Sequence, residues 1–247
     1  MASRGASSAA YDTRMRAGLI GGALSLAVSG AVLLLLALVS SIAIEWLGMA
    51  LGWWTEPGSA HAARVLETEI GYVDADFRHS IANVAPIELA LSAANATYEL
   101  LVETSGLRAL ERELVSPEGA RETRAAAFAT DAYRGARDYL HAAVYVTQLF
   151  AVRCTIVLLS LPLFVLVAFC GSTDGLVQRE LRKKGGGREY GLVYHKVKSW
   201  FRLSLFVPAF VYLASPFAIH PNTVLLPAAI VVGLLSFLVT ATFKKYL

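Results

Sequence analysis

The sequence has few charged residues and almost no cysteine, and both shortages restrict its class. Only 17% of the 247 residues are charged, whereas 56% are hydrophobic and the mean hydropathy is +0.54. Soluble domains are usually about 45–50% apolar and about 25% charged. The two cysteines, Cys154 and Cys170, lie about 24 Å apart on a helix and cannot bridge each other. The composition therefore indicates a membrane protein without a structural disulfide within the chain.

Signals of catalysis and of cofactor binding are also missing. His61, His79 and His141 are scattered and do not have the spacing of metal ligands. A phosphate-binding loop needs glycines followed by Lys and then Ser or Thr, after a strand. Here Lys183 and Lys184 precede the glycines, and no Ser or Thr follows them directly. We therefore expect no enzymatic activity, no metal and no nucleotide or other cofactor.

Four apolar runs have the character of membrane-spanning helices. The first, Ala17–Ile44, has no charge over 28 residues and is too long for the core of a signal peptide. Arg153 stands at the start of the second run, from where its side chain can reach the membrane interface. We expect Pro208 and Pro216 to bend the third. The sequence predicts membrane helices over residues 17–44, 142–171, 201–219 and 223–243, with a tight turn at 220–222 between the last two.

The basic residues predict the orientation of these helices. All six lysines lie between the second and third helices or after the fourth, and Arg4, Arg14 and Arg16 precede the first. Because loops rich in Lys and Arg stay inside, we predict an all-α polytopic membrane protein with four transmembrane helices and both termini, 1–16 and 244–247, in the cytoplasm. The spacing of Gly18 and Gly22 lets two helices approach closely, so the first helix is a candidate oligomer interface.

The stretch between the first two helices, residues 45–141, then lies outside the cell membrane. It contains 15 acidic residues, 8 arginines and no lysine, for a net charge of −7. Its Ala, Glu, Leu and Arg content predicts helices, with a break near Gly106. A further helix is expected to begin at Ser116–Pro117 and to run unbroken into the second membrane helix. We expect an antiparallel helical spacer or a partner-binding domain. Tryptophans mark the predicted lipid interfaces: Trp46, Trp53 and Trp54 outside, and Trp200 inside.

Residues 172–200 form the most basic part of the chain and contain three consecutive glycines. The second helix is expected to continue through TDGLVQRELRKK, and Gly185 to end it in the left-handed conformation. Another helix is expected to start near Arg188 and to continue into the third membrane helix. The sequence thus predicts a cytoplasmic helical hairpin with the glycines at its tip. Its charge fits the topology alone, but it would also attract anionic lipid, an acidic protein surface or DNA.

The same hairpin carries a recognisable motif. Residues Gly171–Lys198, GSTDGLVQRELRKKGGGREYGLVYHKVK, resemble the signature of a family of inner-membrane proteins encoded by integrating conjugative elements and some plasmids. The pattern of that family is close to D-G-L-V-x-R-[DE]-L-R-R, followed by G-G-G-R-E and V-Y-H. The four-helix layout with a large first outer loop also agrees. This chain departs from the pattern at Lys184, where many members have an aromatic residue, and Gly191 is unusual within a helix.

The resemblance implies a bacterial inner-membrane protein that acts in conjugative DNA transfer, a type IV secretion process. The implied role is an accessory subunit that contacts membrane lipid, the coupling-protein ATPase and other channel proteins, and we expect no direct contact with DNA. The candidate partner-binding residues are Asp174, Arg179, Arg182, Lys183, Gly185, Gly186, Gly187, Arg188, Glu189, Tyr194 and His195.

Two other functions remain open at this point. A transporter or channel would need ionisable groups along its membrane helices, and the runs carry only Arg153 and Arg202 at their borders. A sensor or surface-exclusion protein would use the acidic residues 45–141 as a receptor. A transfer defect in the donor cell would favour the secretion subunit, whereas a change confined to the recipient would favour exclusion.

Overall fold

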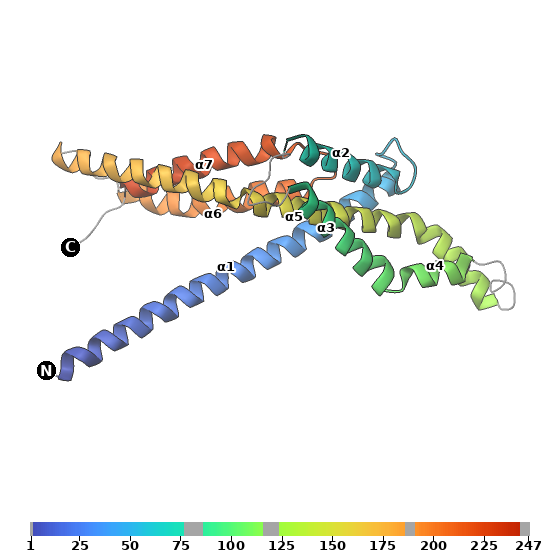
Figure 1. The fold of residues 1–247 in the computed structure, drawn as a ribbon, viewed down its shortest axis with the longest axis horizontal. Coiled ribbons are helices and arrows are strands. Elements are labelled where there is room, and N and C mark those ends of the chain that lie inside the picture. Colours follow the sequence, from blue (N-terminus) through green and yellow to red (C-terminus); the bar gives the residue numbers. More distant parts are fainter. Residues whose placement is uncertain (1, 77–85, 116–123, 186–190, 243–247) are drawn as a thin grey trace.

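The computed structural model describes residues 2–76, 86–115, 124–185 and 191–242 (Figure 1). These ranges contain helices and no strand, which confirms the all-helical prediction for them. Both cysteines are free, as expected. The helices are α1 (Ala2–Leu51), α2 (Ala60–Asp76), α3 (Pro86–Tyr98), the π-helix η1 (Glu99–Thr104), α4 (Leu107–Val115), α5 (Arg124–Lys184), α6 (Gly191–Ala214) and α7 (Pro221–Thr242).

Three of the described helices contain stretches long and apolar enough to cross a membrane. These stretches are Ala27–Leu51 in α1, Gly135–Arg182 in α5 and Pro221–Thr242 in α7. The apolar part of α6, Leu203–Ala214, is shorter than such a span. The chain is therefore compatible with a membrane protein. Its predicted third membrane helix, at 201–219, is shorter in the structure than expected.

The third predicted helix ends before Pro216, whereas Pro208 lies inside α6 and does not end it. Helix α6 ends at Ala214, two residues before Pro216, so Pro216 does not bend the helix as predicted. The residue before a proline is disfavoured in the helical conformation. Residues 215–220, called the linker below, connect α6 to α7. Pro221 is the first residue of α7, the Thr223 N–H donates to the His220 carbonyl at 3.0 Å, and the Asn222 N–H donates to His220 Nδ1 at 3.3 Å.

Helix α5 is the longest element and joins the two ends of the molecule (Figure 1). Its 61 residues run from the acidic segment, residues 45–141, through the second apolar run to Lys184 beside the glycines. The predictions that these parts form one helix, and that it continues through TDGLVQRELRKK, are confirmed. The predicted start at Ser116–Pro117 lies outside the described residues.

Close packing of small residues holds α5 against α7. A Cβ atom added to Gly171 would meet the Gly233 carbonyl, and one added to Gly233 would lie 2.5 Å from Val167 Cγ1. One added to Gly175 would meet Thr240 and Phe237. Gly171 and Gly175 are four residues apart and therefore lie on one face of α5. This is the small-xxx-small arrangement that lets helices approach closely in lipid.

The N-terminal half of α1 lies apart from the other described helices (Figure 1). Leu24 in this half is exposed, as are Val28 and Leu35 in the part of α1 that follows. Further along, Ala37 is buried against Leu213 and Ala214 of α6. An apolar helix surface without protein contacts suits a lipid environment.

The acidic segment packs on α5 through α2 and α3. Ala90 and Ala94 of α3 join the main core with Leu149 and Val152 of α5. Gly106 has a φ of +77° and separates η1 from α4, so the predicted break is confirmed. At the end of α1, Trp46 Nε1 donates to the Tyr139 carbonyl of α5 at 2.9 Å.

Candidate functional site

A buried ion pair forms where α2, α5 and the linker meet. Glu69 belongs to the apolar stripe of α2, between Val65 and Val73, and all three side chains are buried. Arg153 lies on α5 at the start of the second apolar run. The side chains of Glu69 and Arg153 are both 0% exposed. The prediction that Arg153 reaches out to the membrane interface is therefore wrong, because Glu69 offers it a buried partner.

The pair has the forked geometry that guanidinium and carboxylate groups favour. Arg153 Nε donates to Glu69 Oε1 and Oε2 at 3.1 and 3.0 Å, and Nη2 also donates to Oε1. The ring of Tyr212 lies 5.4 Å from Arg153 Cζ. Such paired, charge-assisted bonds are stronger and more directional than neutral ones.

The same arginine also satisfies the backbone of the linker. Its Nη1 donates to the carbonyls of Leu213 and Ser215, and its Nη2 donates to the Phe217 carbonyl at 2.8 Å. Glu69 Oε1 in turn accepts the Ile219 N–H at 3.2 Å. All five N–H donors of Arg153 thus have an acceptor. The pair joins α2, α5 and a non-helical segment between two apolar helices.

This arrangement explains how an irregular backbone can lie next to apolar helices. A backbone carbonyl that is buried away from water without a hydrogen-bond donor costs free energy. In a bilayer, non-helical backbone therefore occurs only where other protein groups donate to its carbonyls. Removing one member of a buried ion pair costs about 3–5 kcal/mol, because the other charge stays buried. We conclude that the Glu69–Arg153 pair holds the acidic segment on the apolar helices.

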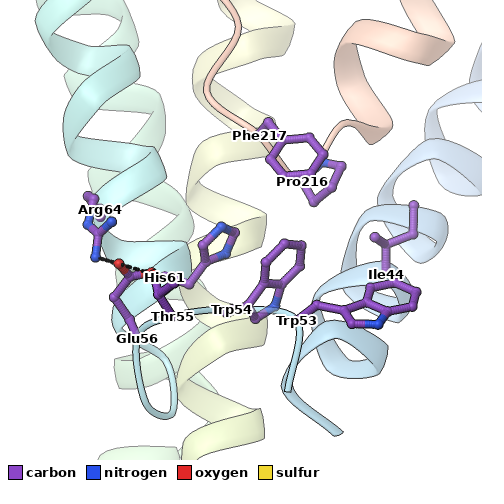
Figure 2. A pocket seen from close by; sticks show the side chains of 9 residues that line it. All are labelled: Ile44, Trp53, Trp54, Thr55, Glu56, His61, Arg64, Pro216 and Phe217. Carbon is purple, nitrogen blue, oxygen red and sulfur yellow. Dashed lines mark hydrogen bonds and ion pairs between the residues drawn. The ribbon is translucent and has the colours of Figure 1, made fainter. Parts of the chain in front are cut away.

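A second polar cluster lies near the end of α1. His61 Nδ1 is 3.0 Å from Glu45 Oε1, and both residues are buried. Trp54 stacks on His61 with ring centroids 3.9 Å apart, and its edge contacts Phe217 of the linker. Figure 2 shows this stack beside Pro216 and Ile44. The linker is therefore held on one side by Arg153 and on the other by Trp54.

Four of the predicted partner-binding residues, Asp174, Arg179, Arg182 and Lys183, lie at the far end of α5. Asp174 is exposed and Arg179 is half-buried. Arg182 donates to the Ala241 carbonyl in the last turn of α7, so part of its role is structural. Lys183 lies within α5, and Gly185 follows directly after the helix. Gly175, a signature residue outside this set, packs closely on α7, and the sequence signature alone did not indicate that role.

The prediction for the conformation of Gly185 is wrong. The described glycines with positive φ are Gly52, Gly58 and Gly106. The Gly185 N–H instead donates to the Leu181 carbonyl at 3.0 Å, as a further helical residue would. Gly186, Gly187, Arg188 and Glu189 lie outside the described residues, as do the side chains of Tyr194 and His195, although both belong to α6.

No group of three or more His, Cys, Asp or Glu side chains suited to a metal ion occurs in the described ranges. The site can therefore be described by its ion pair, its packing and its charges.

A comparison with protein families gives the chain its context. The model of the DtrJ-like family, described as IncC plasmid conjugative DNA transfer protein DtrJ-like, matches residues 53–244. That range is more than three quarters of the chain. The chain belongs to the DtrJ-like family. No curated protein and no solved structure matches it.

The range of the DtrJ-like match shows which parts the family model covers. It includes Glu69, Arg153, the linker and the whole signature at 171–198. It begins at Trp53 and so leaves out all of α1. The expected connection to conjugative DNA transfer is supported at the level of the family.

Proposed function

We propose that the chain is a non-enzymatic, multi-pass subunit of a conjugative DNA-transfer apparatus of the type IV secretion class, located in the bacterial inner membrane. The observation that carries this proposal is membership of a family described as conjugative DNA transfer proteins. The three long apolar stretches in α1, α5 and α7 support its insertion into a membrane. The role is an accessory one: to connect parts of the apparatus on the two sides of the bilayer.

In this proposal the chain crosses the membrane four times, with both termini in the cytoplasm. The third of these spans combines the short apolar helix Leu203–Ala214 with the linker. Twelve helical residues cover about 18 Å, and the linker, which bends at Pro216 and Phe217, extends the span outward to the edge of the core of about 30 Å. The linker is tolerated at this depth because Arg153 and Glu69 satisfy its backbone groups.

The basic hairpin, residues 172–200, is the proposed docking site for the coupling-protein ATPase or another cytoplasmic component. Its α5 part exposes Leu176, Val177 and Leu181 to 47%, 60% and 60%. The exposed charged residues Asp174 and Lys184 lie on the same part of α5. An apolar strip with a charged rim is typical of protein interfaces. This pattern favours a protein partner over DNA, which we propose the hairpin does not contact.

The docking proposal is tested by reversing charge at the end of α5. We expect Lys183→Glu with Lys184→Glu to reduce co-purification with the coupling ATPase, and transfer from donor cells, by about tenfold or more. Arg182 is left intact because it donates to the Ala241 carbonyl. The matched control changes Arg108 and Arg137 to Glu, since both are about half exposed on the acidic segment.

The outcomes separate the competing functions. Wild-type co-purification and transfer in the Lys183/Lys184 variant would contradict docking through the hairpin. A deletion that leaves donor transfer intact but alters recipient behaviour would favour a surface-exclusion protein. A transporter is not favoured by the structure, because Arg153 is fully buried and paired and does not line an open path.

A further inference from the structure

A cleft opens beside the C-terminal end of α1 (Figure 2). Its volume is about 540 Å³, which falls within the usual range of small-molecule sites. We call it the Trp54 cleft. Its walls come from α1, the loop after it, α2 and the linker, and the lining residues are Ile44, Trp53, Trp54, Thr55, Glu56, His61, Arg64, Pro216 and Phe217.

The central wall of the Trp54 cleft is fixed by several contacts. Trp54 and His61 are stacked with an interplanar angle of 3°. Trp54 Nε1 donates to the Glu45 carbonyl at 3.3 Å, and the ring fills the space that a side chain on Gly48 would occupy. The ring of Phe217 meets Trp54 edge-on, at a centroid distance of 5.8 Å. The cleft is therefore pre-formed and does not need to assemble around a ligand.

The rim of the cleft carries one charge of each sign. Arg64 on α2 forms an ion pair with Glu56 in the loop after α1, as Figure 2 shows. The Arg64 side chain is 57% exposed, whereas that of Glu56 is 17% exposed. An exposed arginine can turn outward with little loss of stability, because surface ion pairs contribute little. The rim thus offers a cation and an anion next to an apolar surface made by Ile44, Trp53 and Pro216.

The position of the cleft suits the headgroup layer of a bilayer. The apolar stretch of α1 ends at Leu51, and that of α7 begins at Pro221, directly after the linker. The cleft lies between these two ends, since its walls include the loop after α1 and part of the linker. Tryptophan side chains are enriched at this level of membrane proteins.

We propose that the Trp54 cleft binds a zwitterionic phospholipid that has a primary ammonium headgroup. The Arg64 guanidinium donates to the phosphate of the lipid, and the ammonium of the headgroup donates to the Glu56 carboxylate. The glycerol and the first part of the acyl chains pack on Ile44, Trp53 and Phe217. A choline headgroup has no N–H to donate to Glu56, and an anionic headgroup leaves Glu56 without a cation. The inference rests on the membrane insertion in the proposed function, and not on orientation or on the transfer role.

The test uses tryptophan quenching in symmetric vesicles that contain the purified full-length chain. Phospholipids with bromine near the head end of the acyl chains are added as minor components to an unlabelled choline lipid background. Three headgroups are compared: ethanolamine, choline and glycerol. We expect half-maximal quenching at about fivefold lower content of the brominated ethanolamine lipid than of the other two. Trp53→Phe should remove most of this preferential quenching.

Matched variants identify the groups responsible. Arg64→Gln and Glu56→Gln should each abolish the preference for ethanolamine, while Arg108→Gln, in an exposed pair with Glu103 elsewhere, should retain it. Equal quenching by all three lipids, a preference for the anionic lipid, or a preference that survives in both rim variants would overturn the proposal. Because the vesicles contain no secretion component, failure here is distinguishable from failure of the docking proposal.

Discussion

Arg153 shows how one side chain can decide the position of several others. It lies at the border of an apolar run, yet its guanidinium contacts Glu69 of α2 and three backbone carbonyls of α6 and the linker. The two charges neutralise each other, and the carbonyls use the remaining donors. Neither charge would be stable in this place alone.

We expect Glu69→Leu and Arg153→Leu each to lower the apparent melting temperature in detergent by about 10 °C. This follows from a loss of about 3–5 kcal/mol and from about 2–4 °C per kcal/mol for a chain of this size. The double variant should lose less than the sum of the two, because it leaves no unpaired charge. The melting temperature is measured for all four proteins as a double-mutant cycle.

The exposed Glu103–Arg108 pair provides the control for that cycle. Its replacement by leucines should change the melting temperature little, since exposed pairs contribute at most about 1 kcal/mol. Strictly additive losses for Glu69 and Arg153 would show that the two side chains act independently and would contradict the pairing.

At the scale of elements, the contact between α5 and α7 depends on the absence of side chains. Gly171 and Gly175 on α5 face the backbone and side chains of α7, and Gly233 on α7 faces Val167. Arg182 adds a bond to the last turn of α7. The signature residues 174–182 therefore combine packing positions with exposed ones, and only the exposed ones are accessible to a partner.

A bulky residue at Gly233 should separate the two helices. We expect Gly233→Val to lower the apparent melting temperature by several degrees, because overpacking a tight contact costs about 1–3 kcal/mol. Gly30→Val on α1 serves as the control, since nothing lies within 4 Å of that position. Equal melting temperatures for Gly233→Val and the wild type would show that the close approach is not needed.

At the scale of the whole molecule, α5 determines which segments can lie on which side of a membrane. It carries part of the acidic segment at one end and the first half of the basic hairpin at the other. The two ends of α5 differ in charge. Residues 45–141 have a net charge of −7, whereas Lys183 and Lys184 lie at the other end of the helix. In the proposed topology the lysine end lies in the cytoplasm, as the positive-inside rule predicts.

Cysteine labelling tests this orientation. In a background with Cys154 and Cys170 changed to serine, we expect Gly186→Cys to react with a membrane-impermeant maleimide only after the inner membrane is opened. Gly71→Cys on α2, which is exposed with nothing within 4 Å, should react in cells with an intact inner membrane. Labelling of Gly186→Cys in such cells would reverse the proposed topology.

Local signals in the sequence predicted much of the fold. The helical spacing of apolar residues predicted that α5 continues without a break through the described residues 124–184. Gly106 predicted a break between helices, and its positive φ accounts for that break. The Glu69–Arg153 pair was not predicted, since 84 positions separate its members. One signal could have indicated it: Glu69 is a carboxylate on the apolar stripe of α2. The apolar run continues past Ala214, and it therefore predicts Pro216 inside a helix. This prediction is wrong because hydropathy does not distinguish an apolar helix from an apolar linker.

The length of α5 also has a mechanical consequence. Arg153 is anchored to α2 and to the linker roughly midway along a helix of 61 residues. If α5 pivoted about Arg153 as a lever, its lysine-bearing arm would carry α7 with it, because that arm is packed on α7 at Gly171, Gly175 and Arg182. Pro162, nine positions beyond Arg153, interrupts the backbone bonding of α5 and is the point where such a lever would bend first.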